Sequence, residues 1–319
     1  MNITIDNKPI TAQEGETILQ AAHRNGITIP SMCYAEGHKH RAGCMVCSVK
    51  DIASGRILTS CSTKVTEGMQ IDTSSEEVLN KRRMALELLL SDHRADCEAP
   101  CTQVCKFGLD VEQMLAAYDE GDYAQAKAII RRDFGQTIAC DDCKAPCEKA
   151  CRRGLVDKAV EIRAIIKEVM GMELPEVEAE ESISRLDKDV FCSRVGVFSD
   201  KEKEQIRKTT TPSRCLHCAC SGRENCNLRR YATEYGIKRP RYGLSTKLPV
   251  KLCVEVNDKL RFEPAKCIRC GLCVYNSDNG FTFLQRGFDM QVVIPEQNKI
   301  NAHDNLASIC PTGALYLKR

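Results

Sequence analysis

Cysteine is the residue type that most constrains how this chain can fold. The sequence of 319 residues contains 21 cysteines, which fall into five blocks at 33–61, 97–105, 140–151, 215–226 and 267–310. Such a number implies disulfides, bound metal, or both. The first residues, MNITIDNKPI, lack the basic and apolar regions of a secretory signal, and no long apolar run predicts a membrane span. We therefore expect a cytoplasmic protein, in which cysteines stay reduced and bind metal.

The blocks differ in spacing, and no repeat period relates them, so we expect an array of different modules. The hydrophobic pattern predicts a multidomain α+β chain. Two strands joined at Asp6-Asn7 and a helix over 17–25 are predicted near the start, and helices are predicted over 75–91, 110–118, 122–132 and 156–170. The expected parts are an α+β unit over 1–74, a helical domain over 75–170, an acidic linker over 171–210, a compact cysteine module over 211–245 and a final module over 246–319.

Charge and aromatic content give no indication of nucleic-acid binding. Basic and acidic residues nearly balance, at 46 and 44, and aromatic residues make up only 5% of the chain, with no tryptophan. Such a chain offers few platforms on which bases could stack.

The first block reads Cys33-x10-Cys44-x2-Cys47-x13-Cys61. Four thiolates can hold two irons and two sulfides, because iron in such clusters takes soft, anionic sulfur ligands. Zinc is the alternative, although the ten-residue spacing is unusual for a zinc knuckle. The segments IPSMCY, AGCMVCSV and TSC resemble the N-terminal ferredoxin domain of the complex I large iron–sulfur subunit and of iron-only hydrogenases. That resemblance implies a β-grasp ferredoxin domain with a [2Fe–2S] cluster.

The last block reads Cys267-x2-Cys270-x2-Cys273, followed by Cys310-Pro311. Such a loop supplies three ligands of a [4Fe–4S] cluster, and a distant Cys-Pro supplies the fourth. The segments KCIRCGLCV, GFDMQV and CPTGAL resemble the same complex I and hydrogenase subunits. We expect a small ferredoxin-like domain with one [4Fe–4S] cluster here.

The middle of the chain carries seven cysteines and a histidine. The pattern is His93-x3-Cys97-x3-Cys101-x3-Cys105, followed by Cys140-x2-Cys143-x3-Cys147-x3-Cys151. Two [4Fe–4S] clusters need eight ligands, so the histidine is expected to be the eighth. The alternative is that it is an ordinary surface histidine near a helix end.

Two resemblances meet in this region. LELLLSDHRADC resembles the complex I subunit, where the histidine ligates a [4Fe–4S] cluster, but that family continues as H-x3-C-x2-C-x5-C. DCEAPCTQVC, EGDYAQAKAII and CKAPCEKACRRG resemble the helical two-cluster domain of glutamate synthase small subunits and dihydropyrimidine dehydrogenase. This second resemblance implies an all-α domain with interleaved ligands. The implied sets are His93, Cys97, Cys101 and Cys151 for one cluster, and Cys105, Cys143 and Cys147 with Cys140 for the other.

The fourth block in chain order reads Cys215-x2-Cys218-x-Cys220-x5-Cys226. Its composition fits either a [4Fe–4S] cluster or structural zinc, and we favour iron because every other block is typical of iron. His217 is not expected to be a ligand. The two cysteines outside the blocks, Cys192 and Cys253, are expected to be small buried hydrophobic residues.

The chain contains no G-x-G-x-x-G loop, so neither flavin nor NAD(P) is expected on it, and no catalytic residue is assigned. The expected cofactors are one [2Fe–2S] and three to four [4Fe–4S] clusters. The resemblances imply an electron-transfer subunit of a soluble NAD(P)H-linked oxidoreductase complex that could bifurcate electrons. They imply as partners a flavoprotein like the NADH-oxidising subunit of complex I, a thioredoxin-like [2Fe–2S] subunit, and a further redox subunit or ferredoxin. An independent multi-cluster ferredoxin is the alternative.

Overall fold

The computed structural model divides the chain into two compact units, which are described separately. Unit 1 comprises Met1–His93, Asp189–Phe191 and Gly222–Arg319, and unit 2 comprises Arg94–Lys188 and Cys192–Ser221. Unit 2 is therefore an insertion in the sequence of unit 1. The structure describes residues 1–93, 95–135, 140, 142–182, 186, 190, 198–208, 210–220, 223–238, 241–242, 253–301 and 303–318.

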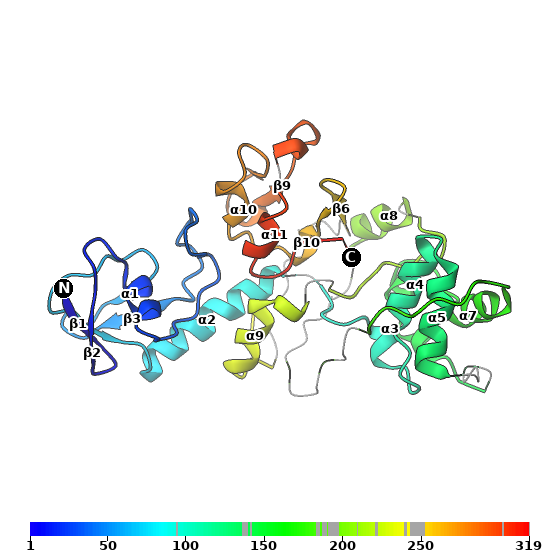
Figure 1. Ribbon diagram of the computed structural model, residues 1–319, viewed down its shortest axis with the longest axis horizontal. Coiled ribbons are helices and arrows are strands. Elements are labelled where there is room, and N and C mark those ends of the chain that lie inside the picture. The colour runs from blue at the N-terminus through cyan, green and yellow to red at the C-terminus, as the bar shows by residue number, and fades with distance from the viewer. Residues whose placement is uncertain are drawn as a thin grey trace. The chain divides into compact units, whose positions relative to one another are not determined.

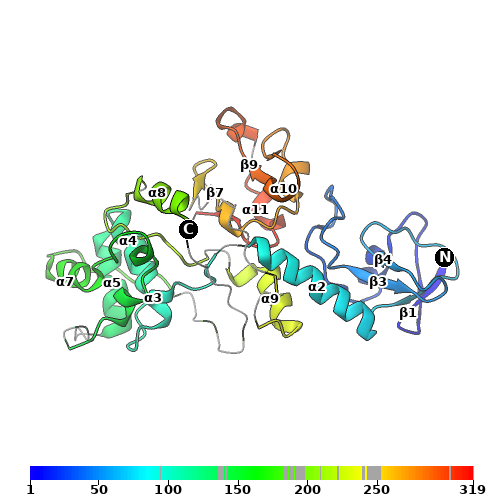
Figure 2. The same cartoon turned by 180° about the vertical axis from the view of Figure 1, so that it is seen from behind.

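A five-stranded sheet begins unit 1 (Figures 1 and 2). Its strands are β1 (Asn2–Ile5), β2 (Lys8–Thr11), β3 (Ser48–Asp51), β4 (Ile57–Thr59) and β5 (Gln70–Asp72), in the order β2-β1-β5-β3-β4. β1 and β5 are parallel, and the other neighbours are antiparallel. Asp6 and Asn7 have φ of 51° and 64°. Positive φ at both central residues is typical of the tight turn that joins two twisted strands, as the sequence predicts.

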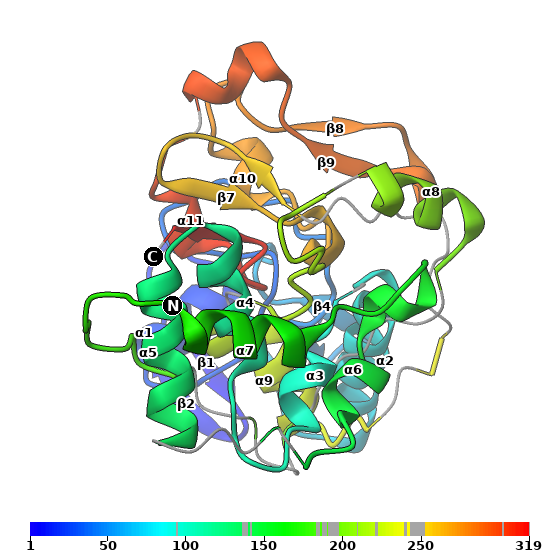
Figure 3. The ribbon, with the colours of Figure 1, turned by 90° about the vertical axis from the view of Figure 1, so that its right-hand side faces the viewer.

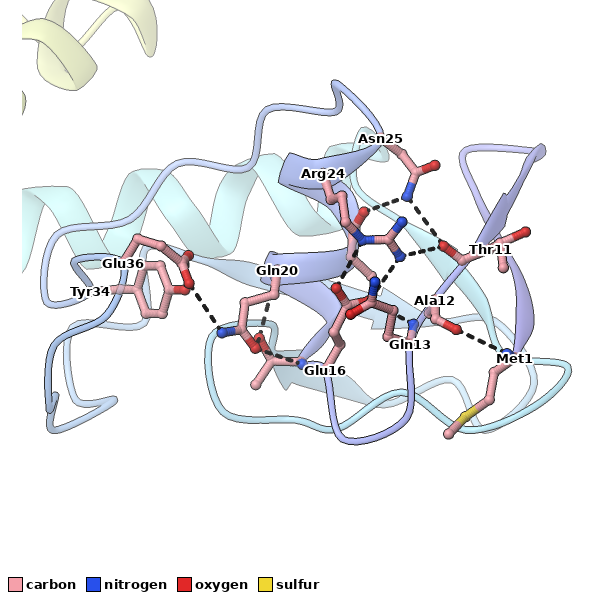
Figure 4. A network of polar contacts seen from close by, with 12 residues as sticks. Met1, Thr11, Ala12, Gln13, Glu16, Gln20, Arg24, Asn25, Tyr34 and Glu36 are labelled. Atoms are coloured by element: carbon pink, nitrogen blue, oxygen red, sulfur yellow. Dashed lines mark hydrogen bonds and ion pairs between the residues drawn. The ribbon is translucent and has the colours of Figure 1, made fainter.

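Helix α1 (Ile18–Arg24) packs its apolar face against this sheet, where Ile18, Leu19, Ala21 and Ala22 are buried. Thr17 begins the helix, because its hydroxyl accepts from the Gln20 backbone N–H at 3.3 Å while the Gln20 side chain accepts from the Thr17 N–H at 3.0 Å. At the other end, Arg24 binds Glu16 at 2.9 Å and the Thr11 carbonyl at 2.6 Å (Figure 4). These contacts fix α1 to the end of β2.

Two helices extend unit 1 beyond the sheet. α2 (Glu76–Asp92) and α9 (Asn227–Glu234) share a hydrophobic cluster that includes Leu86, Leu90 and Tyr231. Arg82 of α2 is only 3% exposed, and its Nε donates to the Ser48 carbonyl of β3 at 2.9 Å. A second nitrogen of this guanidinium donates to the Tyr235 hydroxyl at 3.3 Å. The guanidinium thus connects the sheet, α2 and the end of α9.

The C-terminal part of unit 1 has short strands around its own core. β6 (Val254–Glu255), β7 (Leu260–Phe262) and β10 (Leu315–Leu317) form a sheet in the order β10-β7-β6, and β8 (Thr282–Leu284) pairs with β9 (Gln291–Val293). The helices here are α10 (Leu272–Tyr275) and α11 (Leu306–Ile309). Phe262 and Phe281 meet edge to face in the core, with ring centres 5.4 Å apart.

The described secondary structure of unit 2 is helical (Figure 3). Its α-helices are α3 (Pro100–Gln103), α4 (Val111–Asp119), α5 (Tyr123–Phe134), α6 (Pro146–Lys149), α7 (Ile162–Gly171) and α8 (Asp200–Lys208). Apolar side chains of α4, α5 and α7, such as Met114, Ile129 and Ile166, form one core. Cys101, Cys140 and Cys147 belong to the same core, so the cysteines are part of the packing of this unit.

The prediction of a multidomain fold that mixes α and β is confirmed, and three details differ from the sequence expectations. β5 was not predicted, and α8 lies within the range expected to be a linker. The range 211–245 contributes to both units, because the division falls between Ser221 and Gly222. The expected boundary near 245 lies outside the described residues. In the described part of the chain, no helix is long and apolar enough to span a membrane.

Candidate iron–sulfur cluster sites

The first cysteine group lies beside the five-stranded sheet of unit 1. Cys33, Cys44, Cys47 and Cys61 are all at most 9% exposed. Cys33 is in hydrogen-bonding contact with Cys44 and Cys61, and these contacts lower its pKa. A contact with Cys61 likewise lowers the pKa of Cys47, to about 6. The same contacts raise the pKa of Cys44 and Cys61. The four sulfurs therefore form one group in which two members readily become thiolates, the form that binds iron.

The last cysteine group lies in the C-terminal part of unit 1. Cys267, Cys270, Cys273 and Cys310 are close enough to interact electrostatically with one another. The loop turns at Arg269, which has φ of 56°, and the Arg269 backbone N–H donates to the Cys267 sulfur at 3.3 Å. A hydrogen bond from a backbone N–H stabilises the thiolate form of the sulfur. The group thus has the four ligands and the turn that a [4Fe–4S] cluster needs.

Unit 2 contains a small cavity that is lined by four cysteines. They are Cys105, Cys140, Cys143 and Cys147, and we call this space the Cys105 cavity. Burial, followed by repulsion from the other cysteines, raises the pKa of Cys140 to about 11. Because a cluster binds thiolates, loading this cavity must release protons. The four cysteines are those that the sequence assigned to one [4Fe–4S] cluster.

A second small cavity in unit 2 is lined by Cys101, Cys151, Cys215 and Cys218, and we call it the Cys101 cavity. Burial raises the pKa of Cys101, and the nearby sulfurs of Cys215 and Cys151 raise it further. Cys218 likewise interacts with the other three cysteines. The cavity therefore gathers cysteines from three separate segments of the chain.

This second group differs from the sets expected from sequence. Those sets placed Cys101 and Cys151 with His93 and Cys97, and placed Cys215 and Cys218 with Cys220 and Cys226. The residues that line the Cys101 cavity include neither Cys97 nor Cys220. A sequence signal was available, because Cys215-x2-Cys218 repeats the spacing of Cys44-x2-Cys47 and Cys267-x2-Cys270 and so forms a natural pair.

His93 lies at the end of α2 in unit 1, where it is 3% exposed. Neither ring nitrogen has a hydrogen-bond partner among the described residues. Burial, together with the positive charge of Lys266, lowers the pKa of this imidazole to about 4. The side chain is therefore neutral at physiological pH, with a lone pair free to bind a metal. Its burial does not agree with the alternative of an ordinary surface histidine.

The remaining candidate ligands are also buried. Cys97 and Cys220 are 5% and 3% exposed in unit 2, where the Cys220 N–H donates to the Cys97 carbonyl at 3.4 Å. Cys226 is 7% exposed in unit 1, and its sulfur accepts from the Arg229 N–H at the start of α9 at 3.5 Å. Cys253 is exposed, so the prediction that it is buried is wrong. Cys192 lies outside the described residues.

The cysteine groups fit clusters better than single ions. Among the described residues, no three or more His, Cys, Asp or Glu side chains are close enough to hold one metal ion. A structural zinc ion draws four sulfurs to about 2.3 Å from one point, whereas a [4Fe–4S] core occupies the space between its ligands. Cavities lined by four cysteines agree with the second arrangement.

Comparisons with known proteins identify the domain that carries the first cysteine group. Residues 1–76 match a family described as a 2Fe-2S iron-sulfur cluster binding domain, so the prediction of a [2Fe–2S] domain at the N-terminus is confirmed. The NADP-reducing hydrogenase subunit HndD of Solidesulfovibrio fructosivorans is 37% identical over 157 residues, which are 44% of this chain and 26% of that protein. The mitochondrial NADH-ubiquinone oxidoreductase 78 kDa subunit of Candida albicans is 29% identical over 123 residues, which are 39% of this chain and 17% of that protein. The chain therefore spans about a quarter or less of the length of these two relatives.

A solved structure extends the likeness to the whole chain. A chain in the crystal structure of an NAD+-reducing [NiFe]-hydrogenase in the H2-reduced state superposes with a TM-score of 0.53 and 18% identity, covering 99% of this chain and 87% of that one. At this identity the likeness concerns the fold. Together, these findings confirm the predicted resemblance to the complex I large iron–sulfur subunit and to hydrogenase subunits.

Proposed function

We propose that this chain carries single electrons through several iron–sulfur clusters within an NAD(P)H-linked oxidoreductase complex. The observation that supports this most is the arrangement of its cysteines, because four groups of four mutually close cysteines are far more than packing requires. Thiolates in such groups bind iron–sulfur clusters, which accept and release one electron at a time. The relatives named above belong, by their names, to NADP-linked and NADH-linked enzymes.

The spacing of the sites in unit 1 favours transfer between clusters. Cys33 of the first group and Cys270 of the last group interact electrostatically, and both contact one hydrophobic cluster. Ligands this close would hold their two clusters side by side. An electron that enters at the [2Fe–2S] cluster would therefore have the C-terminal [4Fe–4S] cluster as a near neighbour.

A further cluster ligand is proposed at His93, because both of its buried ring nitrogens lack a hydrogen-bond partner among the described residues. Cys97, Cys220 and Cys226 are the candidate ligands that remain after the groups of four are assigned, and they are buried as well. The cofactors would then be one [2Fe–2S] and four [4Fe–4S] clusters.

The proposed partners follow from the chemistry that this chain would need beside it. A nicotinamide donates two electrons as a hydride, and a flavin converts them into single electrons for clusters. A flavoprotein subunit like the NADH-oxidising subunit of complex I would therefore stand at one end, with a thioredoxin-like [2Fe–2S] subunit beside it. A further redox subunit or ferredoxin would accept the electrons, with or without bifurcation.

The test combines cluster content with activity. Anaerobically purified chain should contain about 18 irons, from one two-iron and four four-iron clusters. It should be reduced by dithionite but should not oxidise NADH or NADPH with viologen dyes. Adding the flavoprotein partner should restore that oxidation.

Two results would contradict the proposal. Stoichiometric zinc with about two irons would remove most of the clusters. Rapid NAD(P)H oxidation by the flavin-free chain alone would demand an active site of its own. Purification from the native cell distinguishes a subunit of a complex from an independent ferredoxin, because an independent ferredoxin would not co-purify with flavin-containing subunits.

A further inference from the structure

We infer that Cys101, Cys151, Cys215 and Cys218 together bind one [4Fe–4S] cluster, so that the C-x2-C turn at 215–218 completes a site begun in the helical domain. This inference rests on the proposed function, because it takes the chain to be an iron–sulfur protein. It assigns a ligand set that spacing along the sequence does not suggest.

The two cavities of unit 2 are the first support. The Cys105 and Cys101 cavities are each lined by four cysteines. Both border the same hydrophobic core. A cavity with the thiol number of its neighbour fits the same kind of cofactor.

The turn at 215–218 is the second support, because it repeats the turn of the C-terminal site. His217 has φ of 45° and its backbone N–H donates to the Cys215 sulfur at 3.3 Å. Arg269 has φ of 56° and its N–H donates to the Cys267 sulfur at 3.3 Å. Residues other than glycine rarely adopt positive φ, so the shared conformation indicates a shared task. In both turns, that task is to aim two sulfurs at one site.

Contacts to α4 hold this turn in place. The Ser213 N–H and hydroxyl donate to the Asp119 carboxylate at 2.6 and 2.7 Å. The two ring nitrogens of His217 lie 3.0 Å from Asp119 and 3.4 Å from Glu112. Asp119 and Glu112 lie near opposite ends of α4, so the turn is anchored along the length of that helix. His217 is thus a positioning residue, and its imidazole binds carboxylates rather than metal.

The one-turn helices α3 and α6 direct neighbouring cysteines to different cavities. Cys101 lies in α3 and lines one cavity, whereas Cys105 follows that helix and lines the other. Cys147 lies in α6 and lines the Cys105 cavity, whereas Cys151 follows that helix and lines the Cys101 cavity. Four residues rise only about 6 Å along a helix, so the two clusters would be close neighbours.

Paired substitutions in the full-length, anaerobically purified chain test the ligand set by iron and sulfide analysis. Cys151→Ala and Cys218→Ala should each remove about four irons, the content of one cluster. The double variant should also lose only about four, because both residues serve the same cluster. Cys147→Ala combined with Cys218→Ala is the matched control and should lose about eight, from two clusters. Cys253→Ala should lose none.

Loss of about eight irons from the Cys151→Ala/Cys218→Ala variant would overturn the inference, as would full iron content in either single variant. If a single alanine variant lost both clusters of unit 2, serine variants would decide through EPR of the reduced protein. Cys151→Ser and Cys218→Ser should alter the same signal, and Cys147→Ser a different one; any other pairing would contradict the ligand set. Wild-type chain without iron would instead overturn the proposed function.

Discussion

Asp96 and Arg152 form a two-point ion pair inside unit 2. The guanidinium donates to both carboxylate oxygens, at 3.0 and 2.8 Å, and the Asp96 side chain is only 1% exposed. Asp96 directly precedes Cys97, and Arg152 directly follows Cys151. The pair therefore joins the cysteine-bearing segment that precedes α4 in the sequence to the one that follows α5.

We expect Asp96→Asn to destabilise unit 2 by roughly 3 kcal/mol, because it leaves a largely buried guanidinium without its counter-charge. The measurement is the midpoint of thermal unfolding at one fixed heating rate. Asp200→Asn is the matched control, since Asp200 is fully exposed and lies 3.5 Å from Lys203. That change should cost less than about 1 kcal/mol. Equal effects of the two substitutions would show that the buried pair does not stabilise the unit.

A second pair in unit 2 makes a prediction about pH. The Arg153 guanidinium donates to both oxygens of Asp157, at 2.7 and 2.8 Å, and holds the pKa of that carboxyl below its ordinary value of 3.8. A carboxyl whose pKa is lowered by folding stabilises the fold at pH values above its ordinary pKa. This contribution is lost as the pH falls through the lowered pKa.

Asp157→Asn should therefore cost about 2 kcal/mol at pH 7, the scale of hydrogen bonds to a charged group. The difference in the free energy of unfolding between wild type and variant should become smaller below pH ~4. Circular dichroism of thermal unfolding between pH 7 and pH 3 measures this difference, with Asp200→Asn unfolded under the same conditions for comparison. A gap for Asp157→Asn that does not change with pH would contradict the assignment of the lowered pKa to the ion pair.

His93 makes a spectroscopic prediction. If its neutral imidazole binds iron, His93→Ala should remove or convert one [4Fe–4S] cluster, and the EPR spectrum should lose one signal. His93→Cys should keep the cluster at a lower reduction potential, because a thiolate adds negative charge to it. His303→Ala, at an exposed histidine of the same unit, should change neither property. An unchanged spectrum in His93→Ala would assign the histidine to packing alone.

Gly271 tests how tightly the C-terminal site is built. It has φ of +84° between Cys270 and Cys273, and an added Cβ would lie 3.0 Å from atoms of Phe283 and Tyr275. Gly271→Ala should therefore cost about 2–4 kcal/mol, from backbone strain and overpacking together, and should weaken the EPR signal of this cluster. Gly287→Ala is the matched control, with φ of +61° and open space around it, and should show the strain alone, about 1–2 kcal/mol. Equal costs would contradict the crowding at Gly271.

Local patterns in the sequence predicted the elements that are stabilised by near neighbours. The turn at Asp6-Asn7, the helix capped by Thr17 and the helices α4 and α5 lie where alternation, caps and periodicity indicate. β5 has only three residues, which pair with β1 and β3, so it is too short for an alternating pattern to be seen. α8 is highly charged, and its single apolar residue, Ile206, is buried. One apolar residue shows no periodicity, so the range looked like a linker.

The cysteine groups likewise differ in whether sequence spacing predicts them. Cys267, Cys270 and Cys273 lie on one loop, and the spacing alone indicates that they act together. The Cys101 cavity instead depends on a segment that returns to α4 through Ser213 and Asp119, which are far apart in the sequence. Spacing carries no information about such a return, so the grouping of Cys215 with Cys101 needed the structure.

The chain order of the cavity cysteines has a consequence for biosynthesis. The Cys105 cavity is complete once the ribosome has made Cys147, whereas the Cys101 cavity waits for Cys215 and Cys218. Between these two moments, the nascent chain would expose Cys101 and Cys151 without the turn that covers them. A cluster with all four of these ligands can therefore be completed in the Cys101 cavity only after translation has passed residue 218.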